Sequence, residues 1–408
     1  MGVGAAPRLS AAEHLRHLDA PEVAPACLSD LRSAPGTHAA AASERLQSLD
    51  VFRGISIAAM LLVNNPGTAK FGYRVLRHAD WNGCQPPDLI FPFFLFIVGV
   101  AITYSLAKPQ SLDASRRALL IKVGRRTLII FGLGMLLNLL PYFDWEVTRI
   151  PGVLQRIALC YCAAALLVLY VGIRGQAVVA VALLVVYGVL MKWVPVPGSG
   201  AGLLEPDTNL AAYIDQALMG GHLWHHHWDP EGFLSTVPAI STTLIGVLAG
   251  HWLRASRRSG ERLRGLVIGG CAGIGLGLVM DEWLPINKAL WSSTYVAFTG
   301  GAALIALAFC HWLVDLKGHR RWATPFVVFG TNAIFAYALS SLMTKLLALW
   351  TVTRSDGMRV MLKTHVFEVY FLPLAARREA SLLYALAFVL LWLGVTGILY
   401  RKRIFIKI

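Results

Sequence analysis

The feature that most constrains this chain is a series of long apolar runs, each bounded by charged residues, Pro or Gly. Runs of about 17 to 25 apolar residues are long enough to cross a bilayer as helices. Of the 408 residues, 56% are hydrophobic and 15% are charged, whereas soluble domains have about 25% charged residues. An ordinary soluble enzyme is therefore excluded, and we predict an all-α, polytopic membrane protein with about ten transmembrane helices. The predicted spans are 50–64, 87–107, 123–140, 153–172, 176–194, 235–253, 264–280, 290–314, 323–347 and 380–400.

The basic residues predict the orientation of these spans. The chain has 37 Lys and Arg against 23 Asp and Glu, a formal net charge of +14. The Lys and Arg residues stand in short clusters between apolar runs and form no single patch. We therefore predict a lipid environment and no nucleic-acid partner. The clusters around Arg116, Arg254 and Lys317 are predicted to be cytoplasmic, and an even number of spans places both termini there. The loop 348–379 is predicted to be external although it is basic, and a re-entrant helix over 366–374 would change its details.

The segment before the first span has a different composition. Residues 1–47 are rich in Ala, Pro, Ser and Arg and lack the continuous apolar stretch of a secretory signal. We predict a disordered cytoplasmic tail there, followed by a transmembrane domain over 48–408. The six cysteines lack the paired spacing of a disulfide or zinc framework and are interpreted as packing residues.

The first two predicted spans carry polar side chains in unusual places. Asp50 and Arg53 lie on one helical face at the inner end of the first span, where they form either an ion pair or a phosphate contact. Asn64 ends that span before a Pro-Gly break. His78 lies in the following loop, and its imidazole is available as a base or a nucleophile or is simply solvated. Asp88 begins the second span, where a helix cap is the alternative to a catalytic role.

Several long motifs resemble one known family. LDVFRG, VNNPG, HADWNG and PPDLIFPFFLFIVGV follow one another within 49–101. RIPGVLQRIALCY, DPEGFLSTVPAI, LPINKALW and a Gly-Thr-Asn segment follow further along, the last at 330–332. Together they resemble the heparan-alpha-glucosaminide N-acetyltransferase family from residue 49 to about 337. Because the matches are long and contiguous, they are more specific than a single short pattern.

The resemblance implies an acetyl-CoA-dependent transmembrane N-acetyltransferase. Members of the family move an acetyl group from cytoplasmic acetyl-CoA to the amino group of a glucosamine across the membrane, and the family also implies a homodimer. The spans begin directly at LDVFRG without a large preceding external domain, which is similar to the bacterial pattern. We therefore expect a bacterial inner (plasma) membrane and an amino sugar or cell-envelope glycan as the acceptor, and heparan is not the expected acceptor.

The resemblance also assigns the catalytic residues. The role of the family's catalytic histidine falls on His78, either as the base or as the acetyl carrier. Asn64 corresponds to the asparagine that ends the first span and is expected to donate a hydrogen bond to the oxyanion. Asp88 completes the predicted catalytic set.

The polyanionic nucleotide end of acetyl-CoA needs cations at the cytoplasmic mouth. We predict Arg53, Arg125 and Arg126 for this role, although a topology signal explains any one of them equally well. Arg156 is added to the cofactor-binding set because an unpaired charge within a span is costly, and Asp88 is its expected partner.

The acceptor is expected to contact polar residues of the external loops, with loop capping and pairing as the alternative. These residues are Trp81, Asn82, Asp229, Glu231, Asn287 and Lys288. A run of histidines in the same region suggests a metal, but adjacent histidines rarely converge on one ion, and no metal is predicted. The run consists of His222, His225, His226 and His227.

Two other classes of function are compatible with a helical membrane protein. A transporter of a sugar or related small solute is the alternative, because broken helices and buried polar residues also suit a substrate pathway. No inverted repeat supports it, and it would accumulate substrate without acetyl-CoA. A structural scaffold ranks last, because it leaves the polar residues of the spans without a role.

Overall fold

The computed structural model describes residues 1–4, 46–68, 70, 72–106, 113–225, 227–255, 257–354 and 356–406. The chain divides into Met1–Glu44 and Arg45–Ile408, and the helices all belong to the second unit. The predicted tail 1–47 lies almost entirely outside the described residues.

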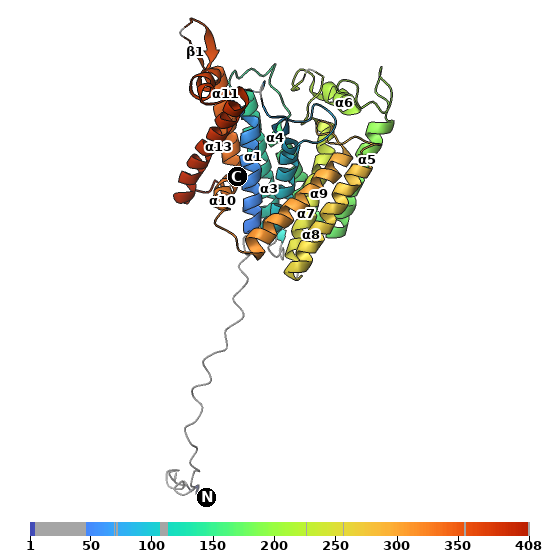
Figure 1. The fold of residues 1–408 in the computed structure, drawn as a ribbon. Helices are drawn as coiled ribbons and strands as arrows, with labels where there is room; N and C mark the ends of the chain where they lie inside the picture. The colour runs from blue at the N-terminus through green and yellow to red at the C-terminus, as the bar shows by residue number, and fades with distance from the viewer. Residues whose placement is uncertain are drawn as a thin grey trace. The chain divides into compact units, whose positions relative to one another are not determined.

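The described part of the second unit is a bundle of α-helices with one small hairpin (Figure 1). The helices are α1 (Gln47–Asn64), α2 (Ile90–Ser105), α3 (Asp113–Leu139), α4 (Val153–Tyr170), α5 (Ile173–Trp193), α6 (Leu210–Met219), α7 (Phe233–Arg254), α8 (Ser259–Val279), α9 (Ser293–Cys310), α10 (Thr324–Thr331), α11 (Ala333–Leu349), α12 (Leu362–Val366) and α13 (Arg377–Arg401). Short 3₁₀ turns cover Arg74–Leu76, Pro86–Leu89 and Leu372–Leu374, and π-helical turns cover His311–Leu316 and Phe367–Phe371.

Seven of the described helical segments are long and apolar enough to cross a membrane. An eighth span results if α10 and α11, which meet at an angle of 81°, are counted together. The prediction of an all-helical, polytopic membrane protein is therefore confirmed, with a smaller count than ten. The other two predicted spans are helical as α1 and α3 but do not meet the same criterion. Charged residues inside them, Asp50 and Arg53 in α1 and Arg125 and Arg126 in α3, lower their apolar character.

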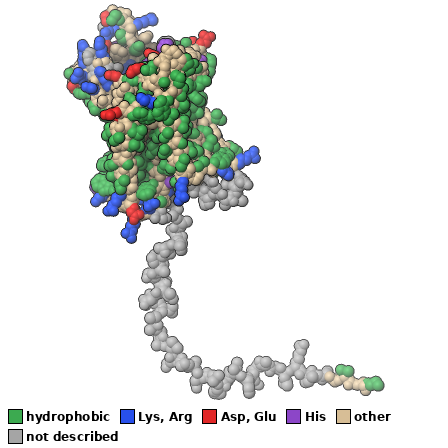
Figure 2. Space-filling model, turned by 90° about the vertical axis from the view of Figure 1, so that its right-hand side faces the viewer, with side chains coloured by type: hydrophobic (Ala, Val, Ile, Leu, Met, Phe, Trp, Pro, Cys, Tyr) green, Lys and Arg blue, Asp and Glu red, His purple; other side chains and the backbone are tan. Residues whose placement is uncertain are grey.

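The bundle has two ends, which differ in their loops. We call the site end the one where α1 finishes, α13 begins and α6 and the hairpin lie, and the far end the one where α1 begins (Figure 1). Figure 2 shows hydrophobic side chains over the middle of one face and charged side chains gathered toward its two ends. This banding is what a bilayer-spanning bundle requires, because lipid contacts the middle and water contacts the ends.

The crossing of α1 and α10 fixes the position of the first polar residues. A side chain at Gly54 would meet the Phe326 carbonyl oxygen at 1.7 Å, and one at Gly330 would meet the Asp50 carbonyl oxygen at 2.0 Å. Only glycine permits this close approach of the two backbones. The contact holds the start of α1 against the break between α10 and α11.

The hairpin was not predicted from the sequence. Strands β1 (Thr351–Thr353) and β2 (Arg359–Met361) pair antiparallel with Thr351 opposite Met361. The helical turns over Leu362–Leu374 follow it and include the stretch in which a re-entrant helix was considered. A three-residue strand with exposed ends gives too short an alternation to be read from the sequence.

Candidate active site

His78 and Asp88 form the central pair at the site end. The Asp88 Oδ1 atom lies 2.6 Å from Nδ1 of His78, and its Oδ2 atom accepts hydrogen bonds from the backbone N–H groups of Ala79 (3.0 Å) and Gln85 (2.9 Å). Asp88 is completely buried at the start of the second span, whereas the His78 side chain is 45% exposed. Since a carboxylate only accepts hydrogen bonds, the pair places the hydrogen of a neutral His78 on Nδ1 and leaves Nε2 as the basic nitrogen.

Lys288 joins this pair from the loop before α9. Its ammonium nitrogen donates to Asp88 Oδ1 at 3.3 Å and lies 3.0 Å from His78 Nδ1. Because Nδ1 directs its hydrogen to Asp88, this second approach is not a hydrogen bond. The Tyr295 hydroxyl donates to the Asp88 backbone carbonyl at 2.5 Å, which ties α9 to the same turn. One buried carboxylate thus fixes an imidazole and an ammonium group from segments about 210 residues apart.

The loops that carry His78 and Lys288 are joined directly. Gly83 donates its backbone N–H to the Ile286 carbonyl at 2.7 Å, and the Asn287 amide donates to Asn82 Oδ1 at 3.1 Å. Asn287 is fully buried and its Oδ1 atom also accepts from the Leu290 N–H. The Asn287 side chain therefore joins the two loops through its nitrogen and braces its own loop through its oxygen.

Trp81 faces a different neighbour. Its indole N–H donates to the Leu204 carbonyl at 3.0 Å, and its ring meets Trp228 edge to face at 5.1 Å. The Trp228 ring is in turn stacked on His225 at 4.3 Å. Trp81 thus connects the His78 loop to the loop between α5 and α7.

Asn64 is exposed at the end of α1, and Leu62 and Val63 of the same turn line the cavity beside His78. Asn65, by contrast, is buried: its Nδ2 group donates to the Leu61 carbonyl at 2.9 Å and its Oδ1 accepts from Thr344 at 2.5 Å. The two neighbouring asparagines therefore occupy different environments, one open and one packed against α11.

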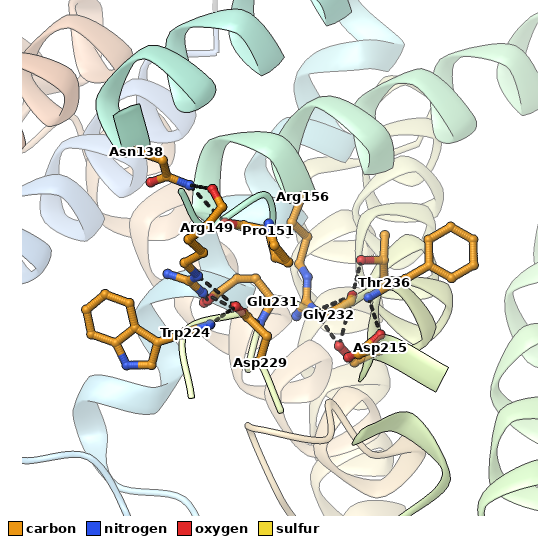
Figure 3. A network of polar contacts seen from close by, with 12 residues as sticks. Asn138, Arg149, Pro151, Arg156, Asp215, Trp224, Asp229, Glu231, Gly232 and Thr236 are labelled. Carbon is orange, nitrogen blue, oxygen red and sulfur yellow. Dashed lines mark hydrogen bonds and ion pairs between the residues drawn. The ribbon is translucent and has the colours of Figure 1, made fainter. Parts of the chain in front are cut away.

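A buried ionic cluster lies at the same end of the bundle (Figure 3). Arg149 binds both carboxylate oxygens of Asp229, at 2.7 and 2.5 Å, and also contacts the Glu231 carboxylate. Asp229 is 3% exposed and also accepts the backbone N–H of Trp224 at 2.8 Å. Burial alone lowers the pKa of Arg149, but the two carboxylates more than offset it and raise the pKa above the ordinary value. Arg149 therefore stays charged and neutralises part of this cluster.

Arg149 was not assigned a role from the sequence, although it begins the motif RIPGVLQRIALCY. Asp229 and Glu231 were expected to bind the acceptor, and their charges meet Arg149 instead. A basic residue in a motif next to a predicted external loop was the only available signal. It could not reveal which acidic loop residues would fold onto Arg149.

Arg156 is buried in α4 next to this cluster (Figure 3). It donates to the Gly232 carbonyl at 3.1 Å and to the Ser235 hydroxyl, and its guanidinium lies 5.0 Å from the centre of the Trp291 ring. Its Nε and one terminal nitrogen have no hydrogen-bond partner among the described residues. The expected pairing with Asp88 is not found, because Asp88 is taken by His78 and Lys288 and Arg156 turns toward α7.

A cavity of about 290 Å³ borders His78. Its walls come from the last turn of α1, the segment 72–78 and the first turns of α13. The segment after α1 is fixed to α13, since the Ser381 carbonyl accepts from Gly67 N–H at 3.2 Å and its hydroxyl accepts from Thr68 N–H at 3.1 Å. The exposed imidazole is therefore next to a preformed space.

A second cavity, of about 430 Å³, opens at the far end. It brings together three of the arginines predicted for the nucleotide, Arg53, Arg125 and Arg126, and adds Lys122, which was not predicted. Among the described residues that line it, none is acidic. Arg53 contacts Asp50 Oδ1 and the Gly330 carbonyl, both at 3.2 Å, so an ion pair is present, and a phosphate contact of Arg53 stays a prediction. Arg156 does not line this cavity.

A narrow apolar void of about 10 Å³ lies further inside the bundle. Met60, Phe91 and Tyr337 are among its walls, and Phe94 and Ile334 line both this void and the far-end cavity. The void therefore adjoins the inner side of the cation-lined cavity. Phe91 packs edge to face on Trp291 at 5.1 Å, which connects the void to the neighbourhood of Arg156.

The histidine-rich loop offers no group of three or more potential metal ligands within the part of the chain that the structure describes. His222 contacts the Thr148 carbonyl at 2.9 Å and His225 stacks on Trp228. His226 lies outside the described residues.

The helices and the two cavities define a polytopic membrane protein with a histidine–carboxylate pair at one end and a cation-lined cavity at the other. Residues 45–272 match the model of the family "heparan-alpha-glucosaminide N-acetyltransferase, catalytic". The chain belongs to this family of membrane N-acetyltransferases, which confirms the resemblance carried by the motifs.

Two relatives show how far the likeness extends. The chain is 30% identical over 426 residues to heparan-alpha-glucosaminide N-acetyltransferase of Homo sapiens, an alignment that covers 89% of this chain and 60% of the relative. It is 28% identical over 423 residues to the protein of the same name from Mus musculus, covering 90% of this chain and 61% of the relative. The chain thus spans about 60% of the length of these relatives.

Proposed function

We propose that this protein transfers an acetyl group from acetyl-CoA, bound from the far end, to the amino group of an amino sugar or cell-envelope glycan at His78. The observation that carries the proposal is the His78–Asp88 pair beside a preformed cavity, with a separate cation-lined cavity at the opposite end of the same bundle. Two such cavities suit a donor and an acceptor that approach from opposite sides of a membrane.

The far-end cavity fits the nucleotide end of acetyl-CoA. Arg125, Arg126 and Lys122 supply cations for phosphates, and Arg53 adds a fourth from α1. The pantetheine arm would follow the apolar path past Phe94 to the void beside Met60, which side-chain movement must widen. Arg156 lies within one helical turn of Val153 and Ile157, two walls of that void, so we assign it to the inner path.

Acetyl-CoA supplies an activated acetyl group on a thioester. In the direct mechanism, His78 Nε2 takes the proton from the amine as the new C–N bond forms and the C–S bond breaks, and then returns that proton to the departing thiolate. Asp88 holds Nδ1–H throughout, and the Asn64 amide donates to the oxyanion. In the covalent alternative, His78 Nε2 attacks the thioester and the C–S bond breaks, so the thiolate of CoA leaves. The amine then attacks the acetyl-imidazole, the bond to Nε2 breaks, and the free Nε2 takes the proton of the amine.

The acceptor residues stay part of the proposal. Lys288 contacts the histidine, Trp81 and Asn82 belong to the same loop as His78, and Asp229, Glu231 and Asn287 support the surrounding loops through their pairing. We place the far end in the cytoplasm and the site end on the periplasmic side of a bacterial inner membrane. A homodimer is part of the proposal on the basis of the family resemblance alone.

The test is transfer of labelled acetyl from acetyl-CoA to glucosamine and its derivatives in proteoliposomes. We expect product from the wild type and a loss of about 10²-fold or more with His78→Ala, the usual contribution of a general base. The matched control is His227→Ala, which removes an exposed histidine at the same end and should retain activity. Equal rates for wild type and His78→Ala would refute the assignment, and uptake of the sugar without acetyl-CoA would favour a transporter.

A further inference from the structure

The cavity beside His78 has one basic side and one apolar side. Its described lining residues include Arg77 and Arg378, and none of them is acidic. Its remaining walls are mainly apolar, with Leu62 and Val63 from α1 and Leu382 and Ala385 from α13. A free sugar has hydroxyl groups on all sides and would leave some of them against apolar walls without hydrogen bonds, which is unfavourable.

The apolar wall belongs to a helix at the edge of the bundle. α13 is one of the candidate membrane spans, and Leu383, Leu386 and Leu390, which do not line the cavity, are 39%, 42% and 64% exposed. These residues face the surroundings of the bundle, which for a spanning helix is the hydrocarbon layer. An apolar chain attached to a ligand in the cavity, if it leaves along Leu382 and Ala385, therefore stays against apolar side chains at membrane depth.

The basic side of the cavity suits an anionic group of a ligand. Arg378 is in the first turn of α13 and Arg77 is next to His78 in the chain, so two arginines from different segments line the same space. Arg77 also donates to the Lys70 carbonyl at 3.0 Å, which anchors it at the rim. Guanidinium groups suit phosphate oxygens in geometry and charge. Glu379, the neighbour of Arg378, does not line the cavity, and its carboxylate accepts a hydrogen bond from the Tyr73 hydroxyl at 3.1 Å.

The volume of the cavity limits what it can hold. At about 290 Å³ it is at the lower end of ligand-binding pockets, enough for a sugar ring and an attached anion but not for a long chain as well. We propose that the acceptor is embedded in the membrane: an amino sugar joined through a phosphate to an apolar chain, with its amine at His78, its phosphate between Arg77 and Arg378, and its chain against Leu382. This inference rests on the proposed function and specifies the class of acceptor.

The experiment compares three acceptors that share one amino sugar, using full-length protein in nanodiscs. The first is soluble glucosamine 1-phosphate, the second is its alkyl phosphodiester, and the third is a neutral alkyl glucosaminide. We expect kcat/KM for the alkyl phosphodiester to exceed that for each of the others at least about tenfold, since one well-placed apolar or ionic contact gives such a factor. Equal kcat/KM values for the first two would overturn the inference and leave the proposed function standing.

Variants separate binding in the cavity from simple partitioning of the alkyl chain into lipid. Leu382→Trp fills the apolar side and should remove the advantage of the alkyl chain, whereas Leu386→Trp, on the exposed side of α13, should retain it. If Leu382→Trp does not fold, Ala385→Leu narrows the same wall. A chain preference that survives in folded Leu382→Trp or Ala385→Leu would mean partitioning alone and would refute the site.

The phosphate contact has its own pair of variants. Arg378→Gln should lower kcat/KM about tenfold for the phosphodiester and leave the neutral glucosaminide unchanged. Arg359→Gln, on exposed strand β2 and outside the cavity, should affect neither acceptor. An equal loss for charged and neutral acceptors in Arg378→Gln would contradict a phosphate contact.

A binding measurement keeps the inference testable if no acetyl transfer occurs. Saturable binding of the alkyl phosphodiester is measured without acetyl-CoA, and we expect Leu382→Trp to weaken it about tenfold and Leu386→Trp to leave it unchanged. Such binding without any transfer would support the acceptor class and reject the proposed reaction. Absence of saturable binding to the wild type would overturn the inference.

Discussion

Asp88 and His78 are unequal partners in burial: the carboxylate is completely enclosed, whereas the imidazole that it touches at 2.6 Å is nearly half exposed. Backbone N–H groups of Ala79 and Gln85 hold the other carboxylate oxygen, so Asp88 cannot turn away. A rigid buried acid thus orients an accessible base, which is the arrangement that preorganised proton transfer needs.

Replacing Asp88 with Asn should separate this orienting role from binding. The amide has the same size but lacks the charge that favours Nδ1–H, so we expect kcat to fall about 10²-fold or more while KM for acetyl-CoA changes little. Steady-state kinetics in proteoliposomes would measure both. Asp80→Asn, an exposed residue of the same loop, is the control. A rise in KM with kcat unchanged would show that Asp88 acts in binding.

The two catalytic alternatives for His78 differ in a covalent intermediate. If His78 carries the acetyl group, protein incubated with labelled acetyl-CoA and no acceptor should keep label after a rapid quench at neutral to alkaline pH, and His78→Ala should lose it. If His78 acts only as a base, neither protein will hold label while the wild type still turns over. Rapid-quench labelling with the His227→Ala protein as a control would decide between the two.

The far-end cavity predicts a charge-dependent affinity for the donor. Removing Arg125 or Arg126 by substitution with Gln should weaken acetyl-CoA binding about tenfold each, because each supplies a charged contact to phosphate. The loss should appear in Kd and KM and should leave kcat at saturation nearly unchanged. Titration of acetyl-CoA by calorimetry would measure it, with Arg320→Gln, an exposed residue outside the cavity, as the control. Unchanged affinity in both arginine variants would place the nucleotide elsewhere.

The Arg149 cluster predicts a loss of stability. Arg149→Met would leave Asp229 and Glu231 buried without their cation, and breaking a buried ion pair in this way costs about 3–5 kcal/mol. Unfolding in mixed micelles would measure the change in free energy. Arg354→Met breaks a pair with Glu368 whose side chains are 34% and 31% exposed, and it should cost less than about 1 kcal/mol. Similar losses of unfolding free energy in both variants would mean that burial of the cluster does not increase its contribution to stability.

The sequence predicted helices well and contacts between loops poorly. Apolar runs of membrane length are a local signal, and each of the ten predicted spans is helical, including α1 and α3 with their internal charges. The span 323–347 is divided into α10 and α11 by a bend of 81° that the sequence did not predict. The meeting of the His78 loop with Lys288 depends on contacts about 210 residues apart, such as the Gly83–Ile286 hydrogen bond. No local pattern encodes such a pairing.

The candidate site was likewise predicted only in part. Arg53, Arg125 and Arg126 were grouped by charge and expected position, and they share a cavity because α1 and α3 both begin at the far end. Arg156 was grouped with them because an unpaired charge within a span is costly, yet its place in the first turn of α4 turns it toward Gly232. Charge identifies candidates, while the position of a residue along its helix decides which of them meet.

Asp215 gives the final prediction, because its carboxyl is buried although it is still mostly charged at neutral pH. Burial raises its pKa to about 6, although the backbone N–H groups of Phe233 and Leu234 and the charge of Arg156 all act to lower it. The folded pKa is thus above the usual value of 3.8, so the folded state binds this proton more tightly than the unfolded state. The stability that Asp215 contributes is therefore complete below about pH 4 and lost as the pH rises through about 6, on the order of 3 kcal/mol in total.

Asp215→Asn should remove this dependence. Its amide oxygen can still accept the Phe233 N–H, which the Asp215 Oδ1 atom accepts at 2.7 Å, so the cap of α7 is retained without the titrating proton. Unfolding free energies of the wild type and the variant would be compared between pH 4 and 8. We expect the variant to gain stability relative to the wild type as the pH rises through 6, whereas Asp207→Asn, an exposed residue of the preceding loop, should follow the wild type throughout. Parallel curves of unfolding free energy against pH for the wild type and Asp215→Asn would mean that the pKa of Asp215 is not raised and that water reaches its carboxyl.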